Sequence, residues 1–165
     1  MSILQKYFLR LLGWPIIAII MVVGITCQQR NIFPDTLLDY TLNQIYSDNL
    51  ARETVDKLHL QPISPDINHI AYYQGDSGNI TIYVATFPDH KQARMAYEKM
   101  IVKITPFNTI FSGGLYTRIQ GKEVYRLDGG IDDHFLFVKE KQVFWLAVQA
   151  STPDIVVKEY IEYIF

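Results

Sequence analysis

The chain has 165 residues, of which 49% are hydrophobic, 13% aromatic and 19% charged. This length suits one domain with an appendage and excludes two large domains, and the apolar and aromatic content excludes a disordered chain. The formal net charge of −2 at pH 7 leaves no basic field for gripping nucleic-acid phosphates. A single cysteine, Cys27, excludes an internal disulfide framework and a zinc site built from paired thiolates.

The N-terminal segment contains an uncharged apolar run from Leu11 to Thr26. With a helical rise of about 1.5 Å per residue, this run and residues 7–9 together approach the thickness of a bilayer core, about 30 Å. The sequence therefore predicts a single membrane-spanning helix in an N-terminal membrane anchor over residues 1–27. Three positions suit such an anchor: Trp14 at the interface, Pro15 in the first helical turn and Gly24 at a helix-packing position.

Charge around this run predicts its orientation. Lys6 and Arg10 precede it, and few basic residues follow it closely, so the positive-inside rule places the N-terminus in the cytoplasm. Residues 28–165 are then expected on the extracytoplasmic side, in the periplasm or at the cell surface. Two alternatives stay open: cleavage of the run as a signal peptide, and lipidation of Cys27, although the residues before Cys27 depart from the usual lipoprotein pattern.

Residues 28–66 are predicted as a linker followed by two short helices. Asp35 and Ser47 are suitable N-caps for helices over 35–45 and 47–58, because apolar residues recur at helical spacing after each of them. Prolines that follow the second segment end it. The linker is short, so we expect the folded part of the chain to lie close to the membrane surface.

Residues 67–165 are predicted as an α+β domain in the order ββα-ββ-ββα. Apolar stripes at helical spacing predict helices over 88–104 and 152–165. Because each stripe needs a sheet to cover, we expect both helices on one face of an antiparallel sheet of about six strands. Alternating residues and turn signals predict these strands at 67–74, 80–87, 115–120, 123–128, 134–139 and 142–150.

Aromatic residues are concentrated in the predicted strands. In strands such residues usually pack in the core or against a neighbouring strand, and an aromatic-rich sheet can also present a flat contact surface to a partner. The aromatic residues concerned are Tyr72, Tyr73, Tyr83, Tyr116, Tyr125, Phe135, Phe137, Phe144 and Trp145.

The sequence contains no motif that assigns a catalytic residue or a cofactor. It lacks a phosphate-binding glycine loop, a CxxC pair, an HExxH helix and a GxSxG elbow. The best polar cluster is the loop Gly129–His134, where Asp132, Asp133 and His134 are candidates for binding a metal ion or for acid–base chemistry. A solvated turn is the alternative, because adjacent residues in an extended segment point apart.

These observations favour a membrane-anchored, non-enzymatic accessory or assembly subunit. Its anchor would contact the lipid bilayer, its extracytoplasmic α+β domain would bind other subunits of a larger membrane complex, and no nucleic acid is expected among its partners. The alternative is an exported domain, with or without lipidation or hydrolytic activity, that binds a small ligand or metal at the Gly129–His134 loop.

Overall fold

The computed structural model describes residues 31–59, 67–104 and 110–165. Three helices occur in these ranges: α1 (Asp48–His59), α2 (His90–Lys103) and α3 (Pro153–Ile164). The same ranges contain eight strands: β1 (Thr36–Leu37), β2 (Tyr40–Ser47), β3 (Ile67–Gly75), β4 (Gly78–Thr86), β5 (Ser112–Ile119), β6 (Lys122–Asp128), β7 (Asp133–Lys139) and β8 (Gln142–Val148).

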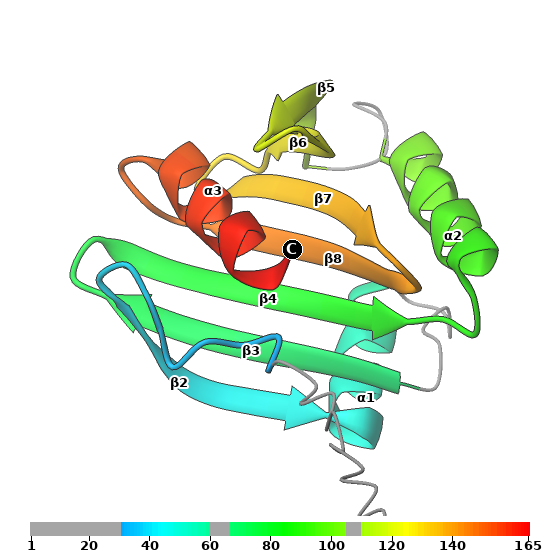
Figure 1. Ribbon diagram of the computed structural model, residues 1–165, viewed down its shortest axis with the longest axis horizontal. Coiled ribbons are helices and arrows are strands. Elements are labelled where there is room, and N and C mark those ends of the chain that lie inside the picture. Colours follow the sequence, from blue (N-terminus) through cyan, green and yellow to red (C-terminus); the bar gives the residue numbers. More distant parts are fainter. Residues whose placement is uncertain (1–30, 60–66, 105–109) are drawn as a thin grey trace, which may run out of the picture.

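All of these strands belong to one antiparallel sheet in the order β1-β2-β3-β4-β8-β7-β6-β5 (Figure 1). Most neighbouring strands follow one another directly in the chain. The exception is the centre of the sheet, where β4 pairs with β8, a strand far along the sequence. The sheet therefore consists of an N-terminal half and a C-terminal half joined along one pair of strands.

One side of the sheet, which we call face A, is covered by α3 and by the segment 31–37. Ile82 and Val84 of β4 point to this face and join the larger hydrophobic core, to which α3 contributes Tyr160. The Tyr160 hydroxyl donates a hydrogen bond to the carbonyl of Ile32 at 3.0 Å. Figure 1 shows α3 in front of the sheet, with the blue N-terminal segment beside it. α3 and the segment 31–37 therefore contact each other as well as the sheet.

The opposite side, face B, is partly covered by α2 and α1. Ala93 and Tyr97 of α2 form a second core with residues that include Leu136 of β7. α1 contacts β2 and β3, and in Figure 1 it lies partly behind the sheet, opposite α3. Ile70 of β3, which pairs with Tyr83 and shares its face, is fully buried at this end. The helices therefore cover both faces of one sheet.

The predicted hairpins and the helix start at Pro88-Asp89 are confirmed. The three hairpins turn at Asp76-Ser77, Gln120-Gly121 and Glu140-Lys141. Asp89 caps α2, because its carboxylate accepts a hydrogen bond from the backbone N–H of Gln92 at 2.8 Å. These features depend on neighbouring residues alone, which is why alternation, turn residues and cap residues predict them.

The predicted helix over 35–45 is wrong, because this segment forms β1 and β2. Apolar residues in so short a segment fit either helical or strand spacing, and β-branched and aromatic residues such as Thr41 and Tyr46 favour the strand. Pairing with β3, for example Leu42 with Tyr73, satisfies backbone groups along one edge of β2. One sheet therefore includes strands from both of the predicted segments 28–66 and 67–165. The second predicted helix, over 47–58, is confirmed as α1.

The predicted fold class is corrected in two further respects. The sheet of the described residues has eight strands, not six, and its helices lie on both faces, not on one. The physical reason is visible in β7, where Phe135, Leu136 and Phe137 are consecutive and each is at most 1% exposed. A strand that buries successive residues has an apolar surface on both sides, so both faces need a cover. α2 and α3 provide covers on opposite faces.

The expected membrane-spanning helix is contradicted, and with it the single-pass, extracytoplasmic localisation. In residues 31–59, 67–104 and 110–165 no helix is long and apolar enough to cross a membrane. The longest, α2, has 14 residues and so measures about 21 Å, against about 30 Å for a bilayer core. The residues assigned to the anchor and to lipidation, Trp14, Pro15, Gly24 and Cys27, lie outside the described residues.

Candidate functional site

Face B carries a row of mostly aromatic side chains that crosses the sheet. Every strand except β1 contributes one residue to this row through the strand register. The two aliphatic residues of the row are fully buried, one beneath α1 and the other beneath α2. In spatial order the row consists of Tyr46, Ile70, Tyr83, Trp145, Leu136, Tyr125 and Tyr116.

In the described part of the chain, α1 and α2 leave one region of face B half-exposed. We call this region the aromatic surface and define it by Tyr46, Tyr72, Tyr83, His134 and Trp145, all of which are half-buried. A second row of the register runs from Tyr72 through two short side chains, Thr81 and Ala147, to His134. Large rings therefore stand around short residues, an arrangement that leaves ring atoms accessible to a partner.

A shallow cavity of about 320 Å³ lies at one edge of the aromatic surface. Tyr46 and Tyr72, which line it, contact each other edge to face with ring centroids 5.6 Å apart. The rest of the lining consists of Tyr73 and of neutral amide side chains from β2, β3 and β4: Asn43, Gln44, Gln74 and Asn79. The edge of the surface thus offers hydrogen-bond donors and acceptors without a charge.

His134 is fixed in one orientation by three neighbours. The indole N–H of Trp145 donates a hydrogen bond to Nδ1 of His134 at 2.9 Å. Phe111 contacts the imidazole edge to face at a centroid distance of 4.7 Å. Gly129 lies so close that a Cβ at this position would be 2.4 Å from Nε2 of His134. Because an indole N–H can only donate, Nδ1 is the acceptor and the proton of the neutral ring is on Nε2.

Burial determines the charge of His134. Desolvation lowers the pKa of this imidazole below its ordinary value of 6.5, although the nearby carboxylates of Asp132, Asp133 and Asp128 act in the opposite direction. Protonation would also place a proton on Nδ1 and break the hydrogen bond from Trp145. The neutral ring is therefore part of the folded arrangement of the aromatic surface at neutral pH.

Lowering the pH below about 6.5 is expected to reduce the free energy of unfolding through His134. The folded-state pKa is lowered, so the unfolded chain takes up this proton at a higher pH than the folded protein does. The contribution is complete above the unfolded-state pKa and is lost as the pH falls toward the folded-state pKa. Urea unfolding at a series of pH values, for the wild type and His134→Gln, measures the difference.

The Gln variant is a suitable control because its amide oxygen can accept from Trp145 and does not titrate. Stability should fall more steeply between neutral and acidic pH in the wild type than in His134→Gln. Identical slopes in the two proteins would show that His134 titrates alike in the folded and unfolded chain.

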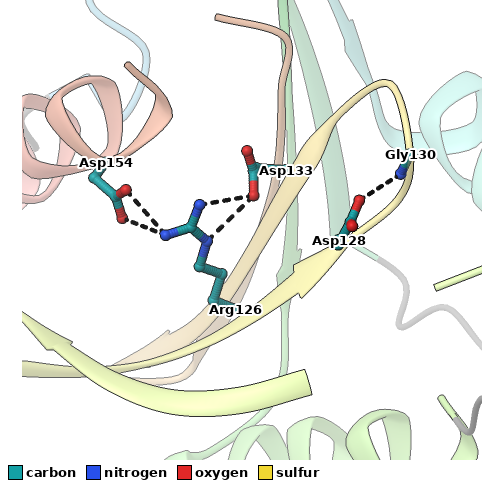
Figure 2. Close-up of polar contacts among 5 residues, drawn as sticks. All are labelled: Arg126, Asp128, Gly130, Asp133 and Asp154. Carbon is teal, nitrogen blue, oxygen red and sulfur yellow. Dashed lines mark hydrogen bonds and ion pairs between the residues drawn. The ribbon is translucent and has the colours of Figure 1, made fainter. Parts of the chain in front are cut away.

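A separate polar network on face A engages Asp133 (Figure 2). The guanidinium of Arg126 binds Asp133 through Nε and Nη2, at 3.2 and 2.9 Å, and binds Asp154 through Nη1, at 3.0 and 3.2 Å. Arg126 also lies over the ring of Phe135, which belongs to the core of face A. Asp154 is in the first turn of α3, so this network attaches the start of α3 to β6 and β7.

The structure does not bring the three metal-site candidates to one point. Asp133 binds Arg126 on face A, whereas the next residue, His134, belongs to face B. No group of three His, Cys, Asp or Glu side chains suited to a metal ion occurs in the described residues. Asp128, at the start of the same loop, accepts from the backbone N–H of Gly130 at 2.7 Å, a turn contact shown in Figure 2. The loop geometry is that of a structured turn.

The aromatic residues singled out in the sequence divide between three environments. Tyr72, Tyr83 and Trp145 belong to the aromatic surface, and Tyr116 packs against Tyr125 at the end of the row. The others point to face A and are buried in its core: Tyr73, Phe135, Phe137 and Phe144.

Sequence reasoning missed three residues of these two regions. Tyr46 directly follows the segment 35–45 that was wrongly predicted as a helix, so its place in a strand was missed, although its β-branched and aromatic surroundings are a strand signal. Phe111 and Arg126 gave no local signal, because their partners are distant in sequence.

Comparison with known proteins bears on the fold alone. No protein-family model and no curated protein sequence matches the chain. A solved structure from Thermotoga maritima, described as a GTP binding regulator, is similar with a TM-score of 0.51 and 12% sequence identity. The similarity covers 78% of this chain and 80% of that protein. At this identity the likeness supports a shared architecture for most of the chain.

Proposed function

We propose that the chain is a non-catalytic, partner-binding protein, an accessory or assembly subunit that docks another protein on the aromatic surface. One observation carries this proposal: tyrosine and tryptophan rings are half-exposed on face B, in a region that α1 and α2 leave uncovered in the described part of the chain. Tyrosine and tryptophan are enriched among the residues that dominate binding energy in protein interfaces. They combine a large apolar area with a polar group and lose little conformational entropy on binding.

The surroundings of the aromatic surface support the same function. A well-formed interface has an apolar centre and a polar rim. Here the rings are bordered by the amide groups of Gln74, Asn79 and Gln149, and the side chain of Asn79 is within 3.5 Å of that of Gln149. Neither of two surface cavities in the described part of the chain is lined by the Gly129–His134 loop. The geometry thus favours a partner on the aromatic surface over a small ligand in that loop.

Replacing Tyr72 and Tyr83 by serine is expected to weaken partner binding at least tenfold, which corresponds to about 1.4 kcal/mol. The full-length tagged chain is purified from its native cells, and a protein recovered in a fixed ratio is then purified separately. Its affinity for the wild type and for the double variant is measured by calorimetry. Thermal melting of the double variant checks that the sheet is still folded.

The matched control removes apolar area elsewhere on the surface. Val102 on α2 and Ile155 on α3 are 74% and 53% exposed, so Val102→Ser with Ile155→Ser should leave the affinity unchanged. If the tyrosine variant binds the purified partner as tightly as the wild type, the aromatic surface is not the docking site. An equal loss in both variants would also contradict the proposal.

A further inference from the structure

We propose that the aromatic surface recognises a cationic side chain, an arginine or lysine of the partner protein. The charge would lie against the half-exposed rings of Tyr83 and Trp145 and beside the carboxylate of Asp132. This inference rests on the proposed function and specifies the chemistry of the partner.

Asp132 lies beside His134, close to the aromatic surface. The backbone N–H of Gly129 donates to the carbonyl of Asp132 at 2.9 Å, and a Cβ at Gly129 would lie 2.4 Å from Nε2 of His134, which bonds to Trp145. The charge of Asp132 acts on both His134 and Tyr83, whose side chains belong to face B. Asp132 is half-buried, and it forms no ion pair within residues 31–59, 67–104 and 110–165. A partly desolvated carboxylate thus lies at the margin of the aromatic rings without a cation from the described chain.

The electrostatic surroundings of the rings are negative. Burial, the neighbouring Tyr72 and the charge of Asp132 together raise the pKa of Tyr83 to about 12. The charged groups that act on His134 are likewise all carboxylates: Asp132, Asp133 and Asp128. Part of the effect of Asp133 is balanced by Arg126, which leaves Asp132 as the largest unbalanced charge that acts on His134.

Aromatic faces and a carboxylate attract the same kind of ligand. The negative face of a tyrosine or tryptophan ring draws a cation, and the attraction grows when the site is partly desolvated. A carboxylate adds Coulomb attraction and a hydrogen-bond acceptor for a guanidinium or an ammonium group. An anionic ligand would be repelled by both. A purely apolar ligand would leave Asp132 desolvated without compensation, which is costly. A cationic side chain satisfies both features.

The test uses the full-length chain with Trp14→Phe, so that Trp145 is the sole tryptophan and its fluorescence reports on the aromatic surface. The probes are N-acetyl-arginine amide and the neutral, nearly isosteric N-acetyl-citrulline amide. We expect a saturable fluorescence change in the millimolar range with the arginine probe, weakened by added salt. The citrulline probe should bind at least about fivefold more weakly, consistent with a cation–π contribution of about 1 kcal/mol.

Asp132→Asn tests the carboxylate with almost no change of shape. It should reduce the affinity for the arginine probe about fivefold and lower the preference over citrulline by the same factor, because only the attraction of the rings for the cation then remains. The matched control is Glu159→Gln, which removes a negative charge from the exposed side of α3 on face A and should change neither value. Equal affinity of the wild-type aromatic surface for the arginine and citrulline probes would overturn the inference. This comparison does not depend on the folding of any variant of the aromatic surface.

The partner assay separates failure of this inference from failure of the proposed function. If Tyr72→Ser with Tyr83→Ser weakens partner binding but Asp132→Asn does not, the docking surface stands and the cationic contact is wrong. If the tyrosine variant leaves partner binding intact, the proposed function itself is wrong. Both the proposed function and the cationic contact are supported if the tyrosine variant and Asp132→Asn each lose affinity for the partner and the wild type prefers the arginine probe over the citrulline probe.

Discussion

Truncating Tyr160, Ile161 and Ile164 of α3 to alanine is expected to leave little folded protein at 25 °C. These side chains are 0%, 1% and 6% exposed and form the contact of α3 with face A. Each such truncation costs about 2–5 kcal/mol, so together they remove at least about 6 kcal/mol. This loss is comparable with the whole free energy of unfolding of an ordinary domain, about 5–15 kcal/mol. Urea unfolding followed by circular dichroism measures it.

The control for this experiment truncates the opposite side of the same helix. Lys158 and Glu159 are exposed, so replacing both by alanine should change the free energy of unfolding by less than about 0.5 kcal/mol. Loss of the ring of Tyr160 also removes its hydrogen bond to Ile32, which adds to the difference. Coincident unfolding curves for the triple variant and the wild type would mean that α3 is not docked on the sheet.

Gly78→Ala is expected to lower the free energy of unfolding by about 3 kcal/mol. A Cβ at Gly78 would lie 2.2 Å from the carbonyl oxygen of Gln149, a backbone atom that cannot rotate away. The backbone of Gln149 is itself held, because its N–H donates to the carbonyl of Asn79 at 2.9 Å. The φ angle of 144° at Gly78 adds strain for any other residue. The relief of this clash would disturb the end of the β4–β8 pair.

Gly121→Ala is the matched control for this prediction. Gly121 also has a positive φ, 73°, but a Cβ there meets no atom within 4 Å. Its substitution should therefore cost only the backbone strain, about 1 kcal/mol. Denaturation midpoints of the two variants measure the difference. A loss at Gly78 no larger than that at Gly121 would show that the neighbouring strand end gives way freely.

The parts of the fold that follow from neighbouring residues could be predicted from the sequence. The hairpin turning at Asp76-Ser77 and the cap at Asp89 are examples, because turn residues, alternation and capping act over a few positions. The face that a helix covers is a different matter. The apolar stripe of α2 predicts that this helix packs on a sheet. Only the pairing of β4 with β8 decides which face of the sheet α2 covers. In the sequence, the consecutive apolar residues Phe135–Phe137 were the one indication that both faces of the sheet are apolar.

The candidate site shows the same division. Tyr72, Tyr83 and Trp145 could be recognised as strand aromatics, but their common surface depends on the register of Tyr83 opposite Trp145. A shift of one residue would turn one of these rings to face A. The bonds of Arg126 to Asp133 and Asp154 join β6 to β7 and to α3. No spacing pattern in the sequence predicts these bonds, because Arg126 and Asp154 are 28 positions apart.

The pairing of β4 with β8 has a consequence for how the chain folds during synthesis. β4 ends at Thr86 and its central partner begins only at Gln142, so the middle of the sheet closes only after β5, β6, β7 and β8 have been made. Until then the hairpin of β3 and β4 exposes an open edge and the apolar residues Ile80 and Ile82. Contacts between residues so far apart make folding slow relative to a helical bundle. The half-finished sheet is therefore the species in which this chain is most exposed to aggregation, and binding by a chaperone would protect it there.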